Sequence, residues 1–367
     1  MFHNYLVTSL RALRRNAFFS VINVVVLAIG LGACFMIWQY VRFESQYDTF
    51  HAKADRLYRV PLQTTRNGAV VDEQAANMPA LGPSMKADLP EVANYCRLVQ
   101  TSLFTANISS YVANALEFSR EDERGKIIAF NEEAVWFADE TFLNMFSFPL
   151  IAGSNDALKE PNSVVLTQRI ARKYFGNEPP LGKELRLNRQ RVLKVTAVVE
   201  EVAANSHLQF DILISLSSMR PDFGDGADNW GWPVFYTYIE LSPGTSADAL
   251  QAKLPGFTER RLGKNNEGEY RMQFSLQSIT DIHLKSQLSD ELSSNNNERL
   301  VWFLSLIAVF ILIVAWINYI NLSTAKALER SKEVGLRKTV GATRVQLITQ
   351  FMFDTFIING IALVVAG

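Results

Sequence analysis

Cysteine and histidine are scarce in this sequence, and its net charge is close to zero. The 367 residues include 2 cysteines, 4 histidines, 36 basic residues and 37 acidic residues. Two cysteines cannot build a disulfide framework, and no cysteine or histidine pair has the spacing of a metal-ligand motif. A balanced charge gives no support for a nucleic-acid partner. We therefore predict no metal site and no nucleic-acid binding.

The sequence also lacks a complete motif for nucleotide or phosphate chemistry. The segment 176–183 resembles a phosphate-binding loop, but Glu184 stands where Ser or Thr would hold magnesium. Residues 222–224 match a kinase tripeptide without the loops that accompany it. Asp225 and Asp228 do not complete the spacing of a helix-loop-helix calcium site. We predict no catalytic residue, no cofactor, and an ordinary Pro/Gly turn at 176–183.

Long apolar runs without charge are the feature that the sequence does have. One extends over residues 16–41 and another over residues 300–325. A helix needs roughly 20 apolar residues to cross a bilayer core, where only a helix satisfies the backbone of a single segment. We predict transmembrane helices over both runs, with Gly30 and Gly32 allowing close helix packing. A signal peptide is the alternative for the first run, but that run is too long and lacks a cleavage site.

Basic residues orient these predicted helices. Residues 1–15 carry three arginines and no acidic residue, and the segment 326–350 is predominantly basic. Positive charge collects on the cytoplasmic side of membrane proteins, so we place both segments in the cytoplasm and residues 43–299 outside it. Residues 351–367 are predicted to begin a third transmembrane helix. This stretch is too short to span a membrane, so we expect the sequence to be part of a longer protein.

The segment 43–299 alternates patterns of strands and helices. Ser163–Thr167 and Leu193–Val199 are typical of strands, and Gln168–Phe175 is typical of a helix that Gly176 ends. Strands and helices without a regular β-α repeat predict an α+β domain whose sheets are covered on one face. The predicted fold is thus a membrane protein with transmembrane α-helices and an inserted α+β extracytoplasmic domain.

Two asparagines interrupt the second apolar run. Asn318 and Asn321 are three residues apart, so they share one face of the predicted helix. Hydrogen bonding between helices or at the membrane interface is the simpler interpretation, and contact with a substrate is the alternative.

A motif after the second run carries a resemblance to a known family. The segment Glu329–Thr343 reads ERSKEVGLRKTVGAT. It resembles the sequence that follows this span in FtsX/MacB-type permease subunits of ABC transporters. The matching residues are Arg330, Glu333, Val334, Gly335, Leu336, Arg337, Lys338, Val340, Gly341 and Ala342. The first apolar run and the segment Phe142–Phe210, which looks like a MacB-like periplasmic core domain, extend the resemblance over essentially the whole chain.

The resemblance implies a multi-pass permease of the bacterial inner membrane with its large domain in the periplasm. It implies mechanotransmission, in which a separate cytoplasmic ABC ATPase hydrolyses ATP and the permease carries the movement across the membrane. The chain itself would not be an enzyme. Its implied partners are the ATPase, a second permease copy or repeat, and membrane lipid.

In this resemblance the segment 326–350 is the coupling element that docks on the ATPase. Arg337, Lys338 and Glu333 would make polar contacts, and Val334 and Leu336 would make apolar ones. Composition alone favours a basic loop held by anionic lipid. The residue pattern adds that Gly341 can end one helix in a left-handed cap and that Thr343 can begin the next.

The substrate stays open among antimicrobial peptides, drugs and lipoproteins. A lipoprotein extractor and an ATPase-coupled regulator of a cell-wall enzyme are alternatives within the family. Outside the family, the rival is a two-span sensor of an extracytoplasmic ligand. A sensor would continue into a soluble output module, whereas this chain enters a third apolar stretch.

Overall fold

The computed structural model of the chain describes residues 17–100, 116–122, 124–219, 229–263, 269–339, 341 and 343–366. The chain forms two compact units. The helical unit comprises the described residues up to Ser45 and those from Asn297 onward, and the sheet unit comprises Gln46 to Asn296. The segment 1–15, predicted to be cytoplasmic, and the aspartates between 222 and 228 lie outside the described residues.

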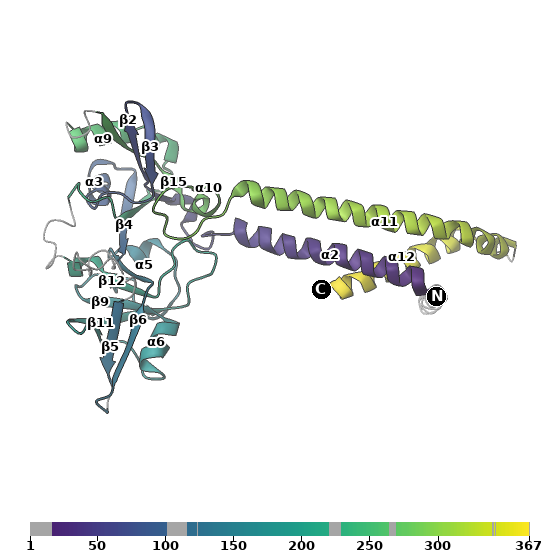
Figure 1. The fold of residues 1–367 in the computed structure, drawn as a ribbon, viewed down its shortest axis with the longest axis horizontal. Coiled ribbons are helices and arrows are strands. Elements are labelled where there is room, and N and C mark those ends of the chain that lie inside the picture. The colour runs from purple at the N-terminus through teal and green to yellow at the C-terminus, as the bar shows by residue number, and fades with distance from the viewer. Residues whose placement is uncertain are drawn as a thin grey trace. The chain divides into compact units, whose positions relative to one another are not determined.

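The helical unit consists of three long helices (Figure 1). They are α2 (Ala17–Ser45), α11 (Glu298–Thr339) and α12 (Arg344–Ala366). Both predicted apolar runs are helical from residue 17 on. Within them, Val21–Ser45 and Glu298–Asn321 are long and apolar enough to cross a membrane. A shorter apolar stretch lies at the end of α12.

Small residues let the three helices approach closely. A Cβ atom added at Gly30 would lie 3.0 Å from the Cβ of Ala315 on α11. One added at Gly32 would lie 3.3 Å from the backbone oxygen of Ala366 on α12. The Cys34 thiol donates to the Ala308 carbonyl at 3.1 Å. The prediction that these glycines permit close packing is confirmed, because a Cβ atom at either position would be in unusually tight contact with the neighbouring helix.

The sheet unit is built on one large mixed sheet and one small sheet. In spatial order the 12 strands of the large sheet are β15 (Gln277–Ser278), β1 (Leu57–Arg59), β13 (Tyr236–Leu241), β4 (Val92–Gln100), β7 (Val135–Ala138), β12 (Ile212–Ser215), β9 (Ser163–Thr167), β11 (Arg191–Val199), β10 (Glu184–Leu187), β5 (Leu116–Glu121) and β6 (Ile127–Glu132), with β8 (Leu150–Gly153) paired to β11. The small sheet has the order β14 (Tyr270–Phe274), β2 (Leu62–Arg66), β3 (Ala69–Gln74).

Short helices accompany these sheets. They are η1 (Ala54–Arg56), α3 (Leu81–Asp88), α5 (Phe142–Met145), α6 (Gln168–Phe175), η2 (Leu216–Met219), α8 (Ala247–Gln251), α9 (Leu254–Leu262), η5 (Ile279–Asp281) and α10 (Ile282–Lys285). In the large sheet, β11 pairs with β9 and β12 with β7 in parallel, and the other pairings are antiparallel. This mixture confirms the predicted α+β class, and the predicted strand Ser163–Thr167 and helix Gln168–Phe175 have the expected bounds.

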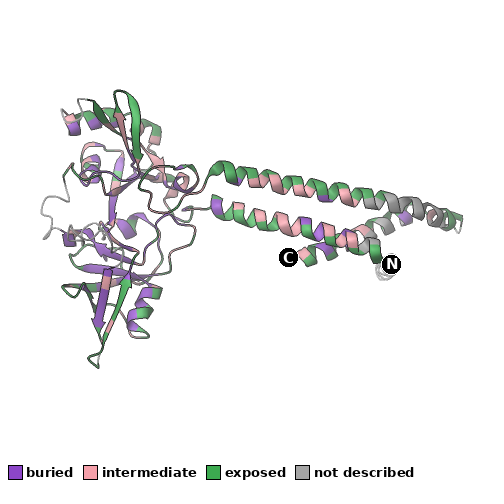
Figure 2. Ribbon diagram, viewed as in Figure 1, coloured by how far each residue is buried: buried purple, intermediate pink, exposed green. Residues whose placement is uncertain are grey.

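The large sheet has a hydrophobic core on each face, and its central strands are accordingly buried (Figure 2). On β9, Val164 and Leu166 join one core cluster, whereas Val165 joins another. Successive residues of a strand point to opposite faces, so the two clusters lie on the two sides of the sheet. The prediction of coverage on one face is wrong. The second face is covered by aromatic residues around α5, including Phe142 and Phe148, which no periodic pattern marked.

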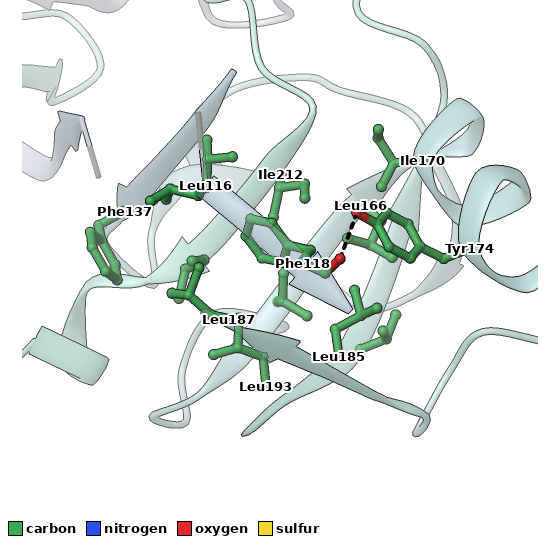
Figure 3. Close-up of a cluster of buried hydrophobic side chains, with 14 of the residues drawn as sticks. Leu116, Phe118, Phe137, Leu166, Ile170, Tyr174, Leu185, Leu187, Leu193 and Ile212 are labelled. Carbon is green, nitrogen blue, oxygen red and sulfur yellow. Dashed lines mark hydrogen bonds between the residues drawn. The ribbon is translucent and has the colours of Figure 1, made fainter. Parts of the chain in front are cut away.

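The first core cluster lies beneath α6 (Figure 3). Ile170 and Tyr174 come from this helix and pack over strand residues such as Phe118 and Leu166. The Tyr174 hydroxyl donates to the Glu132 carboxylate at 2.8 Å, and its oxygen lies 3.3 Å from the Phe118 carbonyl oxygen. Gly176, with a φ of +60°, ends the helix as predicted. The segment 176–183 is therefore a turn between α6 and β10.

Candidate functional site

The segment predicted to couple to an ATPase lies at the junction of α11 and α12. Helix α11 continues without a break past the apolar stretch and ends at Thr339, so most of the predicted basic loop is helical. Gly341 then adopts a φ of +96°, and its amide donates to the Lys338 carbonyl at 3.1 Å. Helix α12 begins at Arg344, directly after Thr343. The predicted left-handed cap at Gly341 is thereby confirmed.

The residues of the family-like motif fall on the last turns of α11 and on this junction. Arg330, Glu333 and Arg337 lie within α11. Other motif residues whose surroundings are described are Val334, which is half-buried, and Gly335, Leu336, Lys338 and Gly341, which are exposed. Leu336 is 70% exposed. Val340 and Ala342 lie outside the described residues. The structure thus brings the motif onto one helix end, where an apolar leucine faces outward.

The two predicted intramembrane asparagines lie on α11. Asn318 is half-buried and Asn321 is exposed. The sequence reasoning missed a third asparagine, Asn23 on α2, which is buried and whose Oδ1 has no hydrogen-bond partner among the described residues. An unpaired amide oxygen is costly in an apolar surrounding. A polar residue inside the first apolar run was the signal that could have marked it.

Buried polar groups of the sheet unit gather beside its first residues. Asp48 is fully buried and accepts hydrogen bonds from His207 Nδ1 at 2.8 Å and from the Ser206 hydroxyl at 2.9 Å. Burial alone would raise the pKa of the Asp48 carboxyl, but His207 and Ser206 outweigh it and hold that pKa below its usual range. His207 Nε2 lies 2.8 Å from the Tyr238 hydroxyl. Burial raises the pKa of Tyr238 well above its usual value.

This Asp48, His207, Tyr238 arrangement resembles a catalytic relay but is closed to substrate. All three side chains are buried, and His51, also buried, lies 3.8 Å from the Asp48 carboxylate. Burial lowers the pKa of His51 to about 4. A catalytic nucleophile or base must reach a substrate, so these groups support the fold rather than a reaction.

A second buried ion pair joins segments far apart in the sequence. The Arg59 guanidinium is fully buried and donates to the Glu291 carboxylate at 2.5 and 2.9 Å. It also donates to Gln277 Oε1 at 2.7 Å and to the Ser286 hydroxyl at 2.9 Å. We call these four residues the Arg59 clamp. No sequence pattern marked any of them.

A polar pocket of 710 Å³ opens where β7 and β12 end. Its wall includes Arg97, which donates to the Asp139 carboxylate at 2.9 and 3.0 Å and to the Pro79 carbonyl at 2.7 Å. Lys159 and Ser217 also line the pocket. Among the described residues, this pocket included, no group of three or more His, Cys, Asp or Glu residues is placed to hold a metal ion.

Family comparison decides what kind of protein has this architecture. The model for the MacB-like periplasmic core domain matches residues 20–256, and the model for the FtsX-like permease C-terminal domain matches residues 305–367. The chain belongs to the MacB/FtsX-type permease family. This confirms the resemblance inferred from the motif, and the second match covers the end of α11 on which the motif lies.

Individual relatives share only about a quarter of their residues with this MacB/FtsX-type chain over the aligned segments. The macrolide export ATP-binding/permease protein MacB of Bdellovibrio bacteriovorus is 26% identical over 203 residues, which are 53% of this chain and 28% of that protein. The uncharacterized ABC transporter permease YknZ of Bacillus subtilis is 24% identical over 228 residues, 60% of this chain and 52% of that protein. The chain therefore spans about a quarter to a half of the length of these curated relatives.

Among solved structures, a domain of a putative permease protein from Porphyromonas gingivalis aligns with a TM-score of 0.49 and 22% identity. The alignment covers 62% of this chain and 91% of that domain.

Proposed function

We propose that this chain acts in the permease of an ABC transporter, coupling ATP hydrolysis by a separate cytoplasmic ATPase to work by its periplasmic domain. The observation that carries this proposal is the motif between Arg330 and Ala342. Its residues from Arg330 to Lys338 lie at the end of a helix that continues without interruption from the apolar stretch Glu298–Asn321. A docking element on the same continuous helix as a membrane span can pass movement directly to that span.

The length of α11 suits this role. Its 42 residues rise by about 1.5 Å each, so the helix is about 63 Å long. Its backbone hydrogen bonds run along the axis, so in this proposal a displacement at one end is carried to the other. In this proposal residues 1–15 and 326–350 are cytoplasmic, the sheet unit is periplasmic, and the chain crosses the bacterial inner membrane several times.

The exposed end of α11 supplies the proposed contacts with the ATPase. Leu336 and Val334 would provide apolar contact, and the exposure of Leu336 supports that assignment. Glu333, Arg337 and Lys338 would provide polar contacts. Interfaces place an apolar centre within a polar rim, and the motif offers both kinds of residue on one helix end.

The further partners are a second permease copy or repeat and membrane lipid. Antimicrobial peptides, drugs and lipoproteins are the substrate classes to test first, because the family includes proteins named for export.

Charge reversal at the docking element tests the proposal. In Arg337→Glu/Lys338→Glu, two favourable charges at the interface become repulsive, so co-purification with the ABC ATPase should be lost. The matched control is Arg124→Glu/Lys126→Glu, a double reversal of exposed residues between β5 and β6, which should leave co-purification unchanged. Retention of the ATPase by the first variant would remove the docking assignment.

A further inference from the structure

The Arg59 clamp joins the two ends of the sheet unit. The incoming connector, residues 46–59, follows α2 along the chain, and the outgoing connector, residues 277–296, precedes α11. Arg59 ends β1 and so belongs to the incoming connector. The clamp residues to which its side chain donates all belong to the outgoing connector. The clamp therefore bridges residues that are up to 232 positions apart in the sequence.

The chemistry of the clamp makes it a specific contact. The guanidinium and the Glu291 carboxylate form two parallel hydrogen bonds, which fix orientation as well as distance. Ser286 accepts from Arg59 and donates to Glu291, so all three side chains are tied together. Removing one member of such a buried pair leaves an uncompensated charge.

The outgoing connector needs such a contact because it has little regular structure. After α10 ends at Lys285, residues 286–297 form neither helix nor strand apart from one bridge between Ser289 and Gln74. A segment of this kind absorbs movement by rotating its backbone dihedrals unless it is held at intermediate points. The clamp holds it at two such points, Ser286 and Glu291.

Other contacts hold the same two connectors. The rings of Tyr47 and His283 stack with their centroids 3.3 Å apart. The Asp48 amide donates to the Asn205 carbonyl at 2.9 Å, which ties the incoming connector to the body of the unit. The Ser289 amide donates to the Glu73 carbonyl at 2.8 Å. The clamp is the charged centre of this set.

We propose that Arg59 is a positioning residue for transmission: it holds the outgoing connector on the incoming one, so that displacement of either is imposed on the large sheet. The route into the sheet is the backbone ladder from β1 to β13 and from β13 to β4. This inference rests on the proposed function, in which the displacement originates at the cytoplasmic end of α11.

The test removes the clamp without burying a charge. The variant Arg59→Met/Glu291→Gln replaces both ionised groups by neutral ones, in a chain whose Cys34 and Cys96 are replaced by alanine. The same background with Tyr47→Cys/His283→Cys restores a tie by a disulfide, because Tyr47 belongs to the incoming connector and His283 to the outgoing one, and their rings stack with centroids 3.3 Å apart. Mass spectrometry verifies the crosslink, and a reductant opens it again.

Hydrogen exchange of the chain in lipid nanodiscs with its ABC ATPase is the readout, with and without ATP and vanadate. With the clamp intact, the nucleotide should change exchange both in 326–350 and in β1 and β13. Without it, the change in 326–350 should persist and the change in the strands should disappear.

Without the clamp, the Ser289 amide should also exchange roughly tenfold faster, equivalent to about 1.4 kcal/mol of lost local protection. The oxidised cysteine pair should restore the strand response, and Arg59→Lys, which lacks the planar fork, should restore part of it.

Each outcome bears on one of the two proposals. A strand response that survives without the clamp, or that the verified crosslink fails to restore, would overturn the role of Arg59. A chain with the clamp intact in which 326–350 does not respond to nucleotide would overturn the proposed function. The Ser289 exchange rate, measured without the ATPase, then decides by itself whether Arg59 holds the connector.

Discussion

The helical unit and the sheet unit handle their large apolar residues in opposite ways. In the sheet unit, Phe142 and Ile212 are fully buried. In the helical unit, Ile29 is 67% exposed and Phe310 is 66% exposed, and a buried position such as 315 holds an alanine. Burial of large apolar groups is the driving force in water, whereas in lipid close packing of small residues takes its place. The two units therefore have the surfaces of proteins folded in two different solvents.

Their buried polar groups differ in the same sense. The sheet unit buries full charges, and pairs such as Arg59 with Glu291 satisfy them. On α2, Asn23 lies buried inside the apolar stretch and is neutral, and its Oδ1 lacks a partner among the described residues, whereas the buried Glu44 lies one residue before the helix ends. A charge in an apolar surrounding requires a partner, and an amide tolerates its absence at lower cost. Matched substitutions in the two units can break or sharpen this comparison.

Truncation of a phenylalanine should give the largest difference between the units. Phe142 packs against Phe146, Phe148 and Phe210 with ring centroids 5.0 to 5.5 Å apart, so Phe142→Ala should cost about 3–5 kcal/mol of unfolding free energy. Phe310→Ala removes an exposed ring and should change it by no more than about 0.5 kcal/mol. Chemical unfolding of the full chain in nanodiscs measures both. Equal losses would mean that the side chain of Phe310 is covered by protein.

Acid should weaken the sheet unit through His51. Burial lowers the pKa of this histidine from 6.5 to about 4, so the unfolded chain takes up a proton at a higher pH than the folded chain does. The free energy of unfolding therefore falls as the pH drops from 6.5 to about 4, by about 3 kcal/mol in total. The lowered pKa of Asp48 acts in the same direction below its usual range, where the unfolded carboxyl takes up a proton first.

The control for this pH dependence is His51→Asn. Asparagine keeps an acceptor for the Ser147 amide, which donates to His51 Nδ1 at 3.1 Å, but it cannot take up a proton. The variant should lose the steepness of the stability curve between pH 6.5 and 4 whatever its stability at neutral pH. Unfolding of the sheet unit is measured at several pH values. If the free energy of unfolding depends on pH as steeply in the variant as in the original chain, the assignment to His51 is contradicted.

Local sequence patterns predicted the helices and strands. The features that they did not predict depend on contacts between residues far apart in the sequence. The helix Gln168–Phe175 and its end at Gly176 follow from residues that are neighbours in sequence, and so do the two apolar helices. The partner Gln277 of Arg59 follows from strand order instead, because β1 lies between β15 and β13. Single-sequence periodicity carries no information on which strands become neighbours, so neither the clamp nor the second core face could be predicted.

The same difference between local and long-range information applies to the helical unit. Gly341 could be recognised as a helix end because a φ of +96° is a property of one residue and its neighbours. Asn23 could be singled out as a polar residue inside the first apolar run but not as a buried one, because α2 packs against α11 and α12, which lie at the other end of the sequence.

The stability of the helical unit should fall more when a side chain is enlarged at a helix contact than when an exposed side chain is truncated. A side chain at Gly30 meets Ala315 at once, because the Cβ atom alone would lie 3.0 Å from the alanine Cβ. Gly30→Leu should therefore force α2 and α11 apart and cost about 1–3 kcal/mol. Gly360→Leu on α12 is the matched control, since nothing lies within 4 Å of the Cβ that it would add. Unfolding in mixed micelles compares the two variants. If both lose the same free energy, the helices are not held by the close approach at Gly30, and the contrast between small buried residues here and large ones in the sheet unit fails.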